Sequence, residues 1–496
     1  MKKFKLFYGN QWMDSTGNKS FQAINPCNGE VIAELLSGTT EDTKAAIQAA
    51  RKAFDSGCWS DLDYDERAAY LHKVADIMEE RFEELAKWEA MDTGKPISET
   101  RSIDIPLSIR AFRFHADGIK SLKGQVIKVP GKHLFDYVTY EPFGVVGSIA
   151  PWNFPLHLLT RSIAAALAAG NTVVCKAAEI TSVTTQILGE IFLEAGVPAG
   201  VYNSISGSGR IVGEELLAND SVDMVALTGS EGVGRRFMTA SAEAKRIKKL
   251  SLELGGKSAM IVDSNCDFNA AVNSAIQGFC TNQGEVCVST SRLLLPNDLY
   301  EDFLISMTEK ISRLRIGDCL DEKTQMGSLV SEKHLNSVQG FVDRAITEGG
   351  KVRIGGKRLT GGDYDKGFYF QPTIIENVTR DMEIFQEEVF GPVLAVTRYE
   401  TMDEAIELAN DTRFGLGAAI MSEDIRTLYW VAEKLDAGTV WMNCVSKSNI
   451  ETPFGGNKNS GIGREDGTEG LLEYLKTKNH IQYVGTPYED FFGFDQ

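Results

Sequence analysis

Three short segments carry side chains that could take part in covalent catalysis. Cys287 follows a glycine-containing turn, where a thiol can project from the end of an element. Glu253 lies in the apolar stretch Leu252–Leu254, which two glycines follow, and a carboxylate is costly there unless it has a function. Asn153 lies between two prolines in Pro151–Pro155, where its amide could donate to a developing oxyanion.

These residue types suit the addition of a thiol to a carbonyl group followed by hydrolysis. A thiolate adds readily to a carbonyl carbon, and a carboxylate made more basic by apolar surroundings can take a proton from water. Each residue also has an ordinary structural explanation: a buried cysteine, a salt-bridged strand end and a simple turn. No histidine lies near Cys287 in the sequence, so the local pattern does not support a Cys–His hydrolase, although long-range pairing stays open.

Two glycine-rich turns follow apolar strands and are candidates for phosphate binding. Gly207–Gly213 has the spacing GxGxxxG, and the next strand carries only Asp223, near its start. That departure from the dinucleotide fingerprint favours plain turn glycines. Gly229–Gly234 follows a clean strand and opens a helix, where free backbone N–H groups suit a pyrophosphate. The second turn is the better candidate, although turns of this kind are common.

The elements that would position these segments form two series of alternating strands and helices. The first series has apolar strands at 145–150, 172–176, 202–206 and 222–228, with helices at 162–169, 184–195 and 210–218. The second starts near Gly255, with strands at 259–262 and 292–295 and helices at 268–279 and 299–314. This alternation predicts an α/β fold with parallel sheets covered on both faces.

The region before these series is predicted to be mixed. Thr40 is expected to cap a helix over 45–54. The i+3/i+4 spacing of apolar residues from Leu71 to Leu85 predicts one long amphipathic helix that ends near Gly94. Residues 133–141 alternate in character and predict a long ribbon strand.

Composition excludes several classes of protein. The chain has 496 residues, enough for two to four domains, and its net charge of −18 argues against a nucleic-acid-binding protein. No apolar run approaches the roughly 18 residues of a membrane helix, and the basic start lacks the apolar stretch of a signal peptide, so we expect a cytoplasmic protein. Eight scattered cysteines and six histidines lack metal-ligand spacing, so we expect no metal site and no disulfide framework.

Seven segments occur in a fixed order along the chain: Pro151–Pro155, Lys176–Glu179, Gly229–Gly234, Leu252–Lys257, Gly284–Cys287, Glu388–Pro392 and Pro453–Glu465. Together they resemble the aldehyde dehydrogenase superfamily over essentially the whole chain. The resemblance implies a Rossmann-like cofactor domain, an α/β catalytic domain and a small β-ribbon that joins subunits. We therefore expect residues 1–122 and 142–254 to bind NAD, 255–471 to form the catalytic domain, and 123–141 with 472–496 to form the ribbon.

The resemblance also implies a role for each matching residue. Cys287 matches the nucleophile, which forms a thiohemiacetal and, after hydride transfer to the nicotinamide, a thioester. Glu253 matches the base that activates water to hydrolyse the thioester, and Asn153, with the backbone N–H of Cys287, matches the oxyanion hole. The implied NAD contacts place Lys176 and Glu179 at the adenosine ribose, the turn with Ser230 at the pyrophosphate, and Glu388 with Phe390 at the nicotinamide ribose. The full implied set is Trp152, Lys176, Glu179, Gly229, Ser230, Gly234, Glu388 and Phe390.

Four residues are expected to contact the substrate: Phe154, His157, Arg161 and Phe454. His157 and Arg161 are four residues apart, hence on one face of the helix after Asn153. Betaine-aldehyde relatives place an aromatic residue at the Arg161 position, and a guanidinium there would repel a trimethylammonium group. We therefore expect poor use of betaine aldehyde and a better fit to aromatic, polar or acidic aldehydes. The alternative is that Arg161 points away and pairs with an acidic neighbour.

The chain departs from the family pattern at two positions near the site. Ala177 stands where proline is usual, and Glu285 stands where glutamine is common, so the charge near Cys287 differs from that of relatives. The alternative functions are a betaine- or aminoaldehyde dehydrogenase, a CoA-acylating relative and a non-enzymatic binding protein. Glu253 argues against CoA acylation, and the intact catalytic residues argue against an idle protein. The expected partners are a small-molecule aldehyde and further copies of this chain, in a homodimer or homotetramer.

Overall fold

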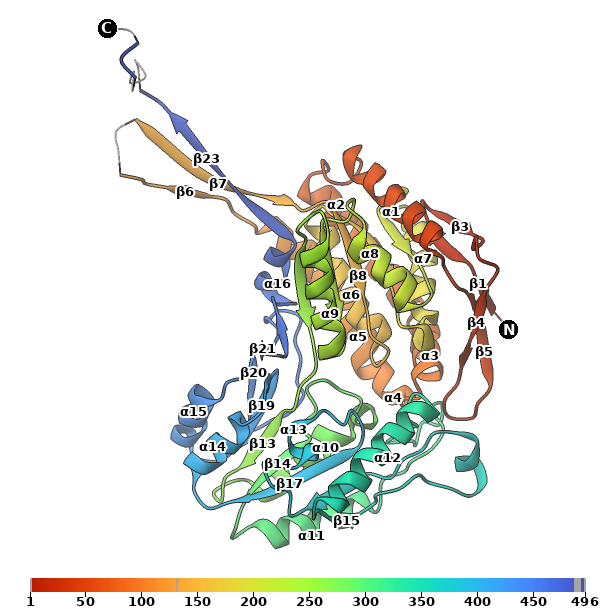
Figure 1. The fold of residues 1–496 in the computed structure, drawn as a ribbon, viewed down its shortest axis with the longest axis vertical. Helices are drawn as coiled ribbons and strands as arrows, with labels where there is room; N and C mark the ends of the chain where they lie inside the picture. The colour runs from red at the N-terminus through yellow and green to blue at the C-terminus, as the bar shows by residue number, and fades with distance from the viewer. Residues whose placement is uncertain (1, 131–132, 486–491, 495–496) are drawn as a thin grey trace.

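Two parallel-stranded sheets and a projecting ribbon organise the chain in the computed structural model, which describes residues 2–130, 133–485 and 492–494 (Figure 1). We call the part built on the eight-stranded sheet the first unit and the part built on the seven-stranded sheet the second unit. The alternating α/β architecture predicted from the sequence is confirmed.

The first unit's sheet has the order β22-β12-β11-β8-β9-β10-β2-β3, and the five strands from β12 to β10 in this order are parallel. Alternate residues of these buried strands face two separate cores. Val145 and Val174 pack against α1, α8 and α9, whereas Val146 and Val173 pack against α5, α6 and α7. The bounds are β8 (Val145–Ile149), β9 (Thr172–Lys176), β10 (Tyr202–Ser204), β11 (Met224–Thr228), β12 (Lys249–Glu253), β22 (Gly461–Ile462), β2 (Leu6–Tyr8), β3 (Gln11–Met13), α1 (Thr40–Asp55), α5 (Ile105–Lys120), α6 (Pro155–Ala168), α7 (Val183–Glu194), α8 (Glu214–Ala218) and α9 (Glu231–Glu243).

The second unit's sheet has the order β15-β16-β17-β14-β13-β19-β20, in which only β15 is antiparallel to its neighbour. Here too successive strand residues face opposite cores, as Met260 and Ile261 do. The bounds are β13 (Ala259–Val262), β14 (Arg292–Pro296), β15 (Lys351–Ile354), β16 (Thr373–Glu376), β17 (Val393–Tyr399), β19 (Gly417–Met421), β20 (Thr439–Met442), α10 (Phe268–Cys280), α11 (Tyr300–Ile311), α12 (Glu332–Thr347), α13 (Glu383–Gln386), α14 (Met402–Asn410) and α15 (Ile425–Lys434).

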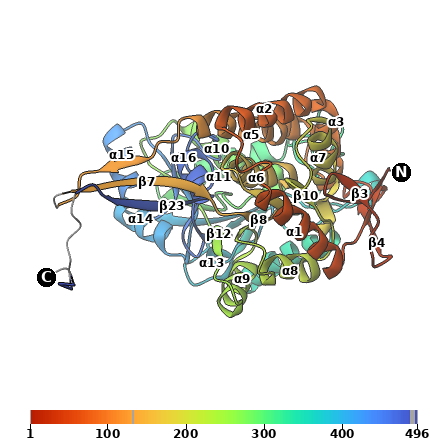
Figure 2. The ribbon, with the colours of Figure 1, turned by 90° about the horizontal axis from the view of Figure 1, so that it is seen from above.

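A three-stranded ribbon projects away from both units (Figures 1 and 2). Its central strand is β7 (Leu134–Pro142), which pairs with β6 (Gln125–Ile127) and, over nine residues, with β23 (Leu475–Tyr483). The predicted strand near 133–141 and its pairing with the C-terminal segment are therefore confirmed. Residues 131–132, 486–491 and 495–496 of the expected ribbon lie outside the described residues, and the domain boundaries remain a prediction.

Two predictions about the early helices were wrong in detail. The single helix expected to end near Gly94 is two helices, α2 (Tyr64–Glu80) and α3 (Phe82–Thr93), which Arg81 separates. Both helices bury an apolar face in the same core, so the i+3/i+4 spacing of apolar residues continues through the break. The Arg81 side chain at the break pairs with Glu84 and Glu190. Helix α1 is capped by Thr39 rather than Thr40, because only Thr39 forms the reciprocal capping box with Asp42.

Smaller elements complete the described chain. A π-helical turn, η1 (Thr100–Asp104), lies between α4 (Ile97–Glu99) and α5, and a second, η3 (Gly209–Gly213), replaces the start of the helix expected at 210–218. No helix of the described chain is both long and apolar enough to cross a membrane. The other elements are β1 (Lys2–Phe4), β4 (Ser20–Ile24), β5 (Val31–Leu36), β18 (Phe414–Gly415), β21 (Asn457–Lys458), α16 (Gly467–Glu473), η2 (Glu179–Thr181), η4 (Thr281–Gly284) and η5 (Gly362–Lys366).

Candidate active site

A cavity of about 650 Å³ lies between the two units, at the carboxyl ends of the first unit's parallel strands. Ligands of open α/β sheets bind at this edge, because the loops that follow the strands gather there. The first unit lines it with residues that follow β8, β9, β10, β11 and β12. The second unit closes it with Cys287, His334, Glu388 and Phe390.

One end of the cavity has the features of a phosphate site. Gly229 and Ser230 line it directly before α9, and the Ser230 side chain makes no capping hydrogen bond. The first amide N–H groups of α9 therefore keep their hydrogen-bonding capacity for an anion. A Cβ added at Gly232 would meet nothing within 4 Å, so the approach to these amides is open.

Lys176 lines the same part of the cavity, at the end of β9. Burial lowers the pKa of its ammonium to about 8, and the nearby charge of Glu179 opposes that shift. Glu179 itself is half-buried in η2 and does not line the cavity. Gly234 does not line it either: a Cβ there would be 2.6 Å from Leu254, so the glycine allows α9 to approach β12.

The turn at 207–213, which the sequence favoured as an ordinary turn, lies in the cavity wall. Ser208, Gly209 and Arg210 all line it, and a Cβ at Gly209 would be 3.9 Å from the Lys176 ammonium. The turn is therefore a further candidate for contact with a ligand in this cavity.

Three rings form the opposite wall. The Trp152 ring centroid lies 5.0 Å from that of His334 and 5.1 Å from that of Phe390, both edge-on. The His334 Nε2 atom is 2.7 Å from the Phe390 carbonyl oxygen, and Phe390 holds a left-handed backbone with φ of +57°. Sequence reasoning missed His334, since nothing in the sequence of α12 marks it as facing the other unit. Beside this wall, Glu388 accepts a hydrogen bond from the Gly256 amide at 3.0 Å, and burial raises the pKa of Glu388 to about 7.

Cys287 follows a sharp turn after α10. Asn282, Gln283 and Gly284 all have positive φ, and a Cβ at Gly284 would collide with the Gly391 carbonyl. Burial raises the pKa of the Cys287 thiol to about 12; Arg161 opposes the shift, whereas Glu388 and Glu253 add to it. The thiol is therefore protonated at neutral pH unless its surroundings change.

Glu253 ends β12 and is only 2% exposed. Neither carboxylate oxygen has a hydrogen-bond partner among the described residues, and no salt bridge to Glu253 is present there. Burial raises the pKa of Glu253 well above its ordinary value, with Arg161 opposing the shift. A salt bridge at the end of the strand would have given Glu253 a structural role, but the described chain contains no such salt bridge.

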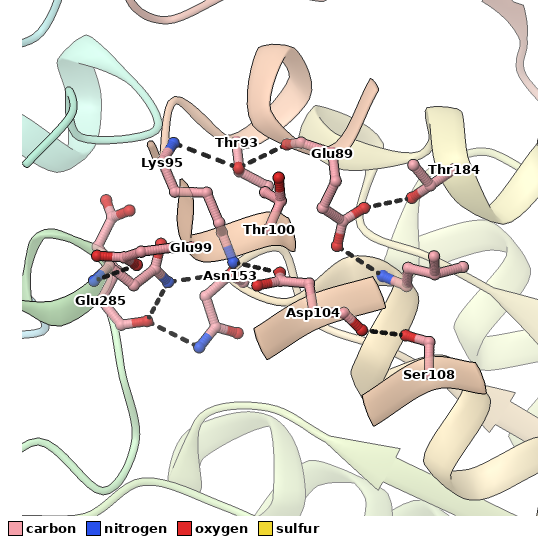
Figure 3. Close-up of polar contacts among 12 residues, drawn as sticks. Glu89, Thr93, Lys95, Glu99, Thr100, Asp104, Ser108, Asn153, Thr184 and Glu285 are labelled. Atoms are coloured by element: carbon pink, nitrogen blue, oxygen red, sulfur yellow. Dashed lines mark hydrogen bonds and ion pairs between the residues drawn. The ribbon is translucent and has the colours of Figure 1, made fainter. Parts of the chain in front are cut away.

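Asn153 is held at both its backbone and its side chain (Figure 3). Its Nδ2 atom donates to the Glu285 carbonyl oxygen at 2.8 Å, and its own carbonyl oxygen accepts from the Lys95 ammonium at 2.7 Å. An amide nitrogen carries two hydrogens, so one remains available for another acceptor. Asn153 and Cys287 both line the cavity, which brings this donor and the thiol into one space.

None of the four expected substrate residues is in the cavity lining. Phe154, directly before α6, and His157 and Arg161 in its first two turns are buried, Phe454 is half-buried, and Leu158 of α6 does line the cavity. The Arg161 guanidinium lies 4.8 Å from the Phe454 ring centroid, and its Nε atom has no hydrogen-bond partner among the described residues. Burial by itself would lower the pKa of Arg161, but the charges of Asp466, Glu465 and Glu253 outweigh it and raise the pKa.

His157 is a neutral neighbour of that guanidinium. Burial lowers its pKa to about 3, with Arg161 contributing, and its Nδ1 atom is without a hydrogen-bond partner among the described residues.

Within the part of the chain that is described, no three His, Cys, Asp or Glu side chains are grouped as a metal site requires.

Comparison with known proteins agrees with this geometry. A model of the Aldehyde dehydrogenase family matches residues 12–480 of the chain. The chain belongs to the aldehyde dehydrogenase family. It is thus an NAD-dependent oxidoreductase that acts on an aldehyde group.

The enzyme has relatives of similar length. It is 39% identical over 481 residues to aldehyde dehydrogenase family 2 member C4 of Arabidopsis thaliana, a match that covers 97% of this chain and 95% of that one. It is 40% identical over 479 residues to retinal dehydrogenase 2 of Gallus gallus, covering 96% and 91%.

Solved structures of relatives match the fold closely. A crystal structure of betaine aldehyde dehydrogenase from Staphylococcus aureus in complex with NAD+ superposes with a TM-score of 0.96 at 38% identity, covering 99% of this chain and 96% of that one. An NAD+ complex of an aldehyde dehydrogenase from Bacillus cereus gives 0.95 at 38% identity, covering 98% and 97%. NAD is accordingly the cofactor of this enzyme.

Proposed function

We propose that this aldehyde dehydrogenase oxidises its substrate through a covalent intermediate on Cys287 that Glu253 resolves with water. The observation that carries the proposal is Glu253 itself: a buried carboxylate with no hydrogen-bond partner among the described residues, whose charge acts on the Cys287 thiol and adds to the rise in its pKa. The fold gains nothing from such a group, so a catalytic use is the better explanation.

The first step joins the Cys287 sulfur to the aldehyde carbon, while the thiol proton passes to water in the cavity. The carbonyl oxygen becomes an oxyanion, which the free Nδ2 hydrogen of Asn153 and the backbone N–H of Cys287 can stabilise. Arg161, which opposes the raised pKa of the thiol, lowers the cost of forming the thiolate. When bound, NAD accepts the hydride that the substrate carbon releases.

The last step hydrolyses the thioester. Glu253 takes a proton from water, the hydroxyl adds to the thioester carbon, and the carbon–sulfur bond breaks to release the carboxylic acid. The proton taken by Glu253 passes to the departing sulfur, which regenerates both the thiol and the carboxylate. A CoA-acylating enzyme would need no such base. NADH formation without CoA therefore separates the hydrolytic reaction from acylation, and no NADH formation at all would indicate a binding protein.

Residues of the cavity lining are candidate contacts for NAD. The α9 amides with Gly229 and Ser230 would hold the pyrophosphate, and Glu388 with Trp152 and Phe390 would hold the nicotinamide end. Lys176 would hold the adenosine ribose from the lining, together with Glu179, which lies outside the lining and whose charge acts on Lys176. Gly234 supports α9 from behind rather than contacting phosphate.

We expect the wild type to prefer NAD over NADP, because Glu179 would repel a 2′-phosphate beside Lys176. Glu179→Ser removes this charge and should lower the ratio of kcat/KM for NAD to kcat/KM for NADP by about tenfold, a change of roughly 1.4 kcal/mol. The measurement is kcat/KM for both cofactors. Glu194→Ser, at an exposed position at the end of α7, serves as the control and should leave the ratio unchanged. A wild type that prefers NADP would rule out this role.

We propose an aromatic or a polar or acidic aldehyde as the substrate class, with a hydroxyl or carboxylate substituent that Arg161 can bind. The Phe454 ring offers an apolar surface against Arg161, whose Nε atom the fold leaves unused among the described residues. The alternative was that Arg161 points away from the substrate and forms a salt bridge with an acidic neighbour. The guanidinium makes no ion pair with a described acid, which argues against this alternative. A charge-assisted hydrogen bond to the substituent would use this capacity.

Arg161→Leu should lower kcat/KM for a hydroxybenzaldehyde or for succinic semialdehyde by about 10- to 100-fold and affect unsubstituted benzaldehyde much less. Betaine aldehyde should be a poor substrate of the wild type. Arg110→Leu removes an exposed arginine that pairs with Glu451 and is the matched control. If betaine aldehyde is the best wild-type substrate, or if the ranking is unchanged in Arg161→Leu, Arg161 does not contact the substrate.

We also propose that the ribbon joins copies of this chain into a homodimer or homotetramer. It carries apolar side chains that the rest of the described chain leaves exposed, including Val126 (71%) and Ile481 (65%), and among the described strands the long edge of β23 is unpaired on one side. Val126→Asp/Ile481→Asp should shift the sedimentation coefficient toward a monomer. Ile247→Asp, at an exposed isoleucine of the first unit, should not. A monomeric wild type would contradict the proposal.

A further inference from the structure

A fully buried ammonium lies against the main chain of Asn153. The Lys95 side chain is 0% exposed, and its Nζ atom donates to Asp104 Oδ1 at 2.6 Å and to the Asn153 carbonyl oxygen at 2.7 Å (Figure 3). The same ammonium is 3.6 Å from the Phe154 ring centroid. One cation thus contacts both residues at the turn that carries the proposed oxyanion donor.

The acids around Lys95 have separate tasks. Glu89 accepts from the Leu156 amide at 3.0 Å and from the Thr184 hydroxyl at 2.6 Å, so it caps the start of α6. Glu99 accepts from the Asn282 amide at 2.9 Å. Burial raises the pKa of both carboxyls to about 7, and Lys95 opposes the rise in each. Asp104 accepts from Lys95 at Oδ1 and also interacts with the Glu89 carboxyl, where its charge adds to the rise in the pKa of Glu89.

A closed set of hydrogen bonds joins this ammonium to the loop of the nucleophile. Asn282 Nδ2 donates to the Asn153 carbonyl at 3.1 Å and to the Glu285 carbonyl at 3.0 Å, and Asn153 Nδ2 donates to that same Glu285 carbonyl. Glu285 is two residues before Cys287. The orientation of the Asn153 amide relative to the thiol is therefore set by two donors on the Asn153 carbonyl, from Lys95 and Asn282.

The backbone on either side of Lys95 is unusual. Gly94 ends α3 with φ of +83°, and a Cβ there would be 2.7 Å from Pro26 and 2.8 Å from Ser328. Asp104 is the last residue of the π-helical turn η1, a conformation that is frequent at functional sites. Lys95 directly follows this glycine, and its ammonium bonds both Asp104 of the π-helical turn and the Asn153 carbonyl oxygen. A brace needed for stability alone could use apolar residues there at lower cost.

We propose that Lys95 is a positioning residue for the oxidation, which fixes the Asn153 main chain so that the side-chain amide can stabilise the oxyanion. The proposal rests on the proposed role of Asn153. Asp104 serves as the counter-ion that orients the ammonium. Removing the ammonium should therefore slow hydride transfer through Asn153, with NAD binding largely unchanged.

The test compares two double variants that differ in one hydrogen-bond donor. Lys95→Met alone would leave Asp104 as an uncompensated buried charge, so both variants carry Asp104→Asn. Lys95→Met/Asp104→Asn leaves the Asn153 carbonyl with the Asn282 donor alone, whereas Lys95→Gln/Asp104→Asn, of nearly the same size, keeps a second donor at position 95. We expect the rate of the NADH burst to fall by about 10- to 100-fold in the Met pair and to stay within about threefold of wild type in the Gln pair. The NAD Kd should change by less than about threefold in both.

A double-mutant cycle separates positioning from general loosening. In an Asn153→Ala background the change from the Gln pair to the Met pair should alter the burst rate by less than about twofold, because the group that Lys95 acts through is gone. Arg51→Met/Asp223→Asn removes an ion pair at the opposite end of the same sheet and should leave the burst rate unchanged.

Several results would overturn the inference. The first is an equal burst rate in the Met and Gln pairs. The second is a fall in burst rate from the Gln pair to the Met pair that is as large in the Asn153→Ala background as without it. The third is a similar fall in burst rate in the Arg51→Met/Asp223→Asn control. If the Met pair does not fold, the Gln pair decides alone: a burst within threefold of wild type supports the inference, and a loss above tenfold contradicts it. A normal burst in Asn153→Ala by itself would instead contradict the proposed role of Asn153.

Discussion

Cys287→Ala is expected to lower turnover by about 10⁴-fold or more while NAD binding stays within a few-fold of wild type. Without the sulfur no covalent adduct forms, so the substrate carbon is not held where it can release a hydride. The thiol belongs to the second unit, whereas the α9 start that would bind phosphate belongs to the first, so loss of the sulfur leaves those contacts intact. NADH absorbance gives the rate, and quenching of protein fluorescence, to which Trp152 in the lining contributes, gives the NAD affinity.

Cys266→Ala is the matched control, since Cys266 is a half-buried cysteine packed against the core of the second unit and outside the cavity lining. It should retain wild-type turnover. Activity of Cys287→Ala within tenfold of wild type would show that Cys287 is not the nucleophile.

Glu253→Gln is expected to lower the steady-state rate by about 10²- to 10⁴-fold and to leave a burst of about one NADH per active site. The amide keeps the size of the side chain but cannot take a proton from water, so the thioester accumulates. Because burial raises the pKa of Glu253, its base form increases with pH. Wild-type hydrolysis should therefore accelerate as the pH rises, and the variant should lose that dependence.

The control for this change is Glu376→Gln, which neutralises another buried carboxylate, in β16, where Lys351 and Arg353 pair with it. Its burst and its steady-state rate should both resemble the wild type. Near-normal steady-state turnover of Glu253→Gln would mean that another group activates the water.

Local sequence patterns were enough to predict the strands of the first unit. Val145–Ile149 and Thr172–Lys176 are short apolar runs between helices, and continuous apolar runs are typical of parallel strands buried on both faces. The catalytic candidates also came from local context, since a carboxylate in an apolar strand is unusual wherever it occurs. Both kinds of signal lie within a few residues of the feature that they predict.

Features that depend on distant contacts could not be predicted in this way. The break at Arg81 is held by Glu190, more than a hundred residues away, and the helical spacing shows no interruption there. His334 reaches the cavity because the second unit packs against the first, which no pattern in α12 indicates. The burial of Lys95 likewise depends on distant residues, since its ammonium bonds the Asp104 side chain and the Asn153 carbonyl oxygen.

The most direct test of the covalent mechanism is mass spectrometry of Glu253→Gln after mixing with NAD and benzaldehyde and quenching in acid. A trapped thioester should add the mass of the aldehyde less two hydrogens to the peptide that contains Cys287, in an amount equal to the NADH burst. The Cys287→Ala/Glu253→Gln variant should show neither adduct nor burst. A burst of NADH with no adduct on Cys287, or with the adduct on another cysteine, would contradict the covalent mechanism.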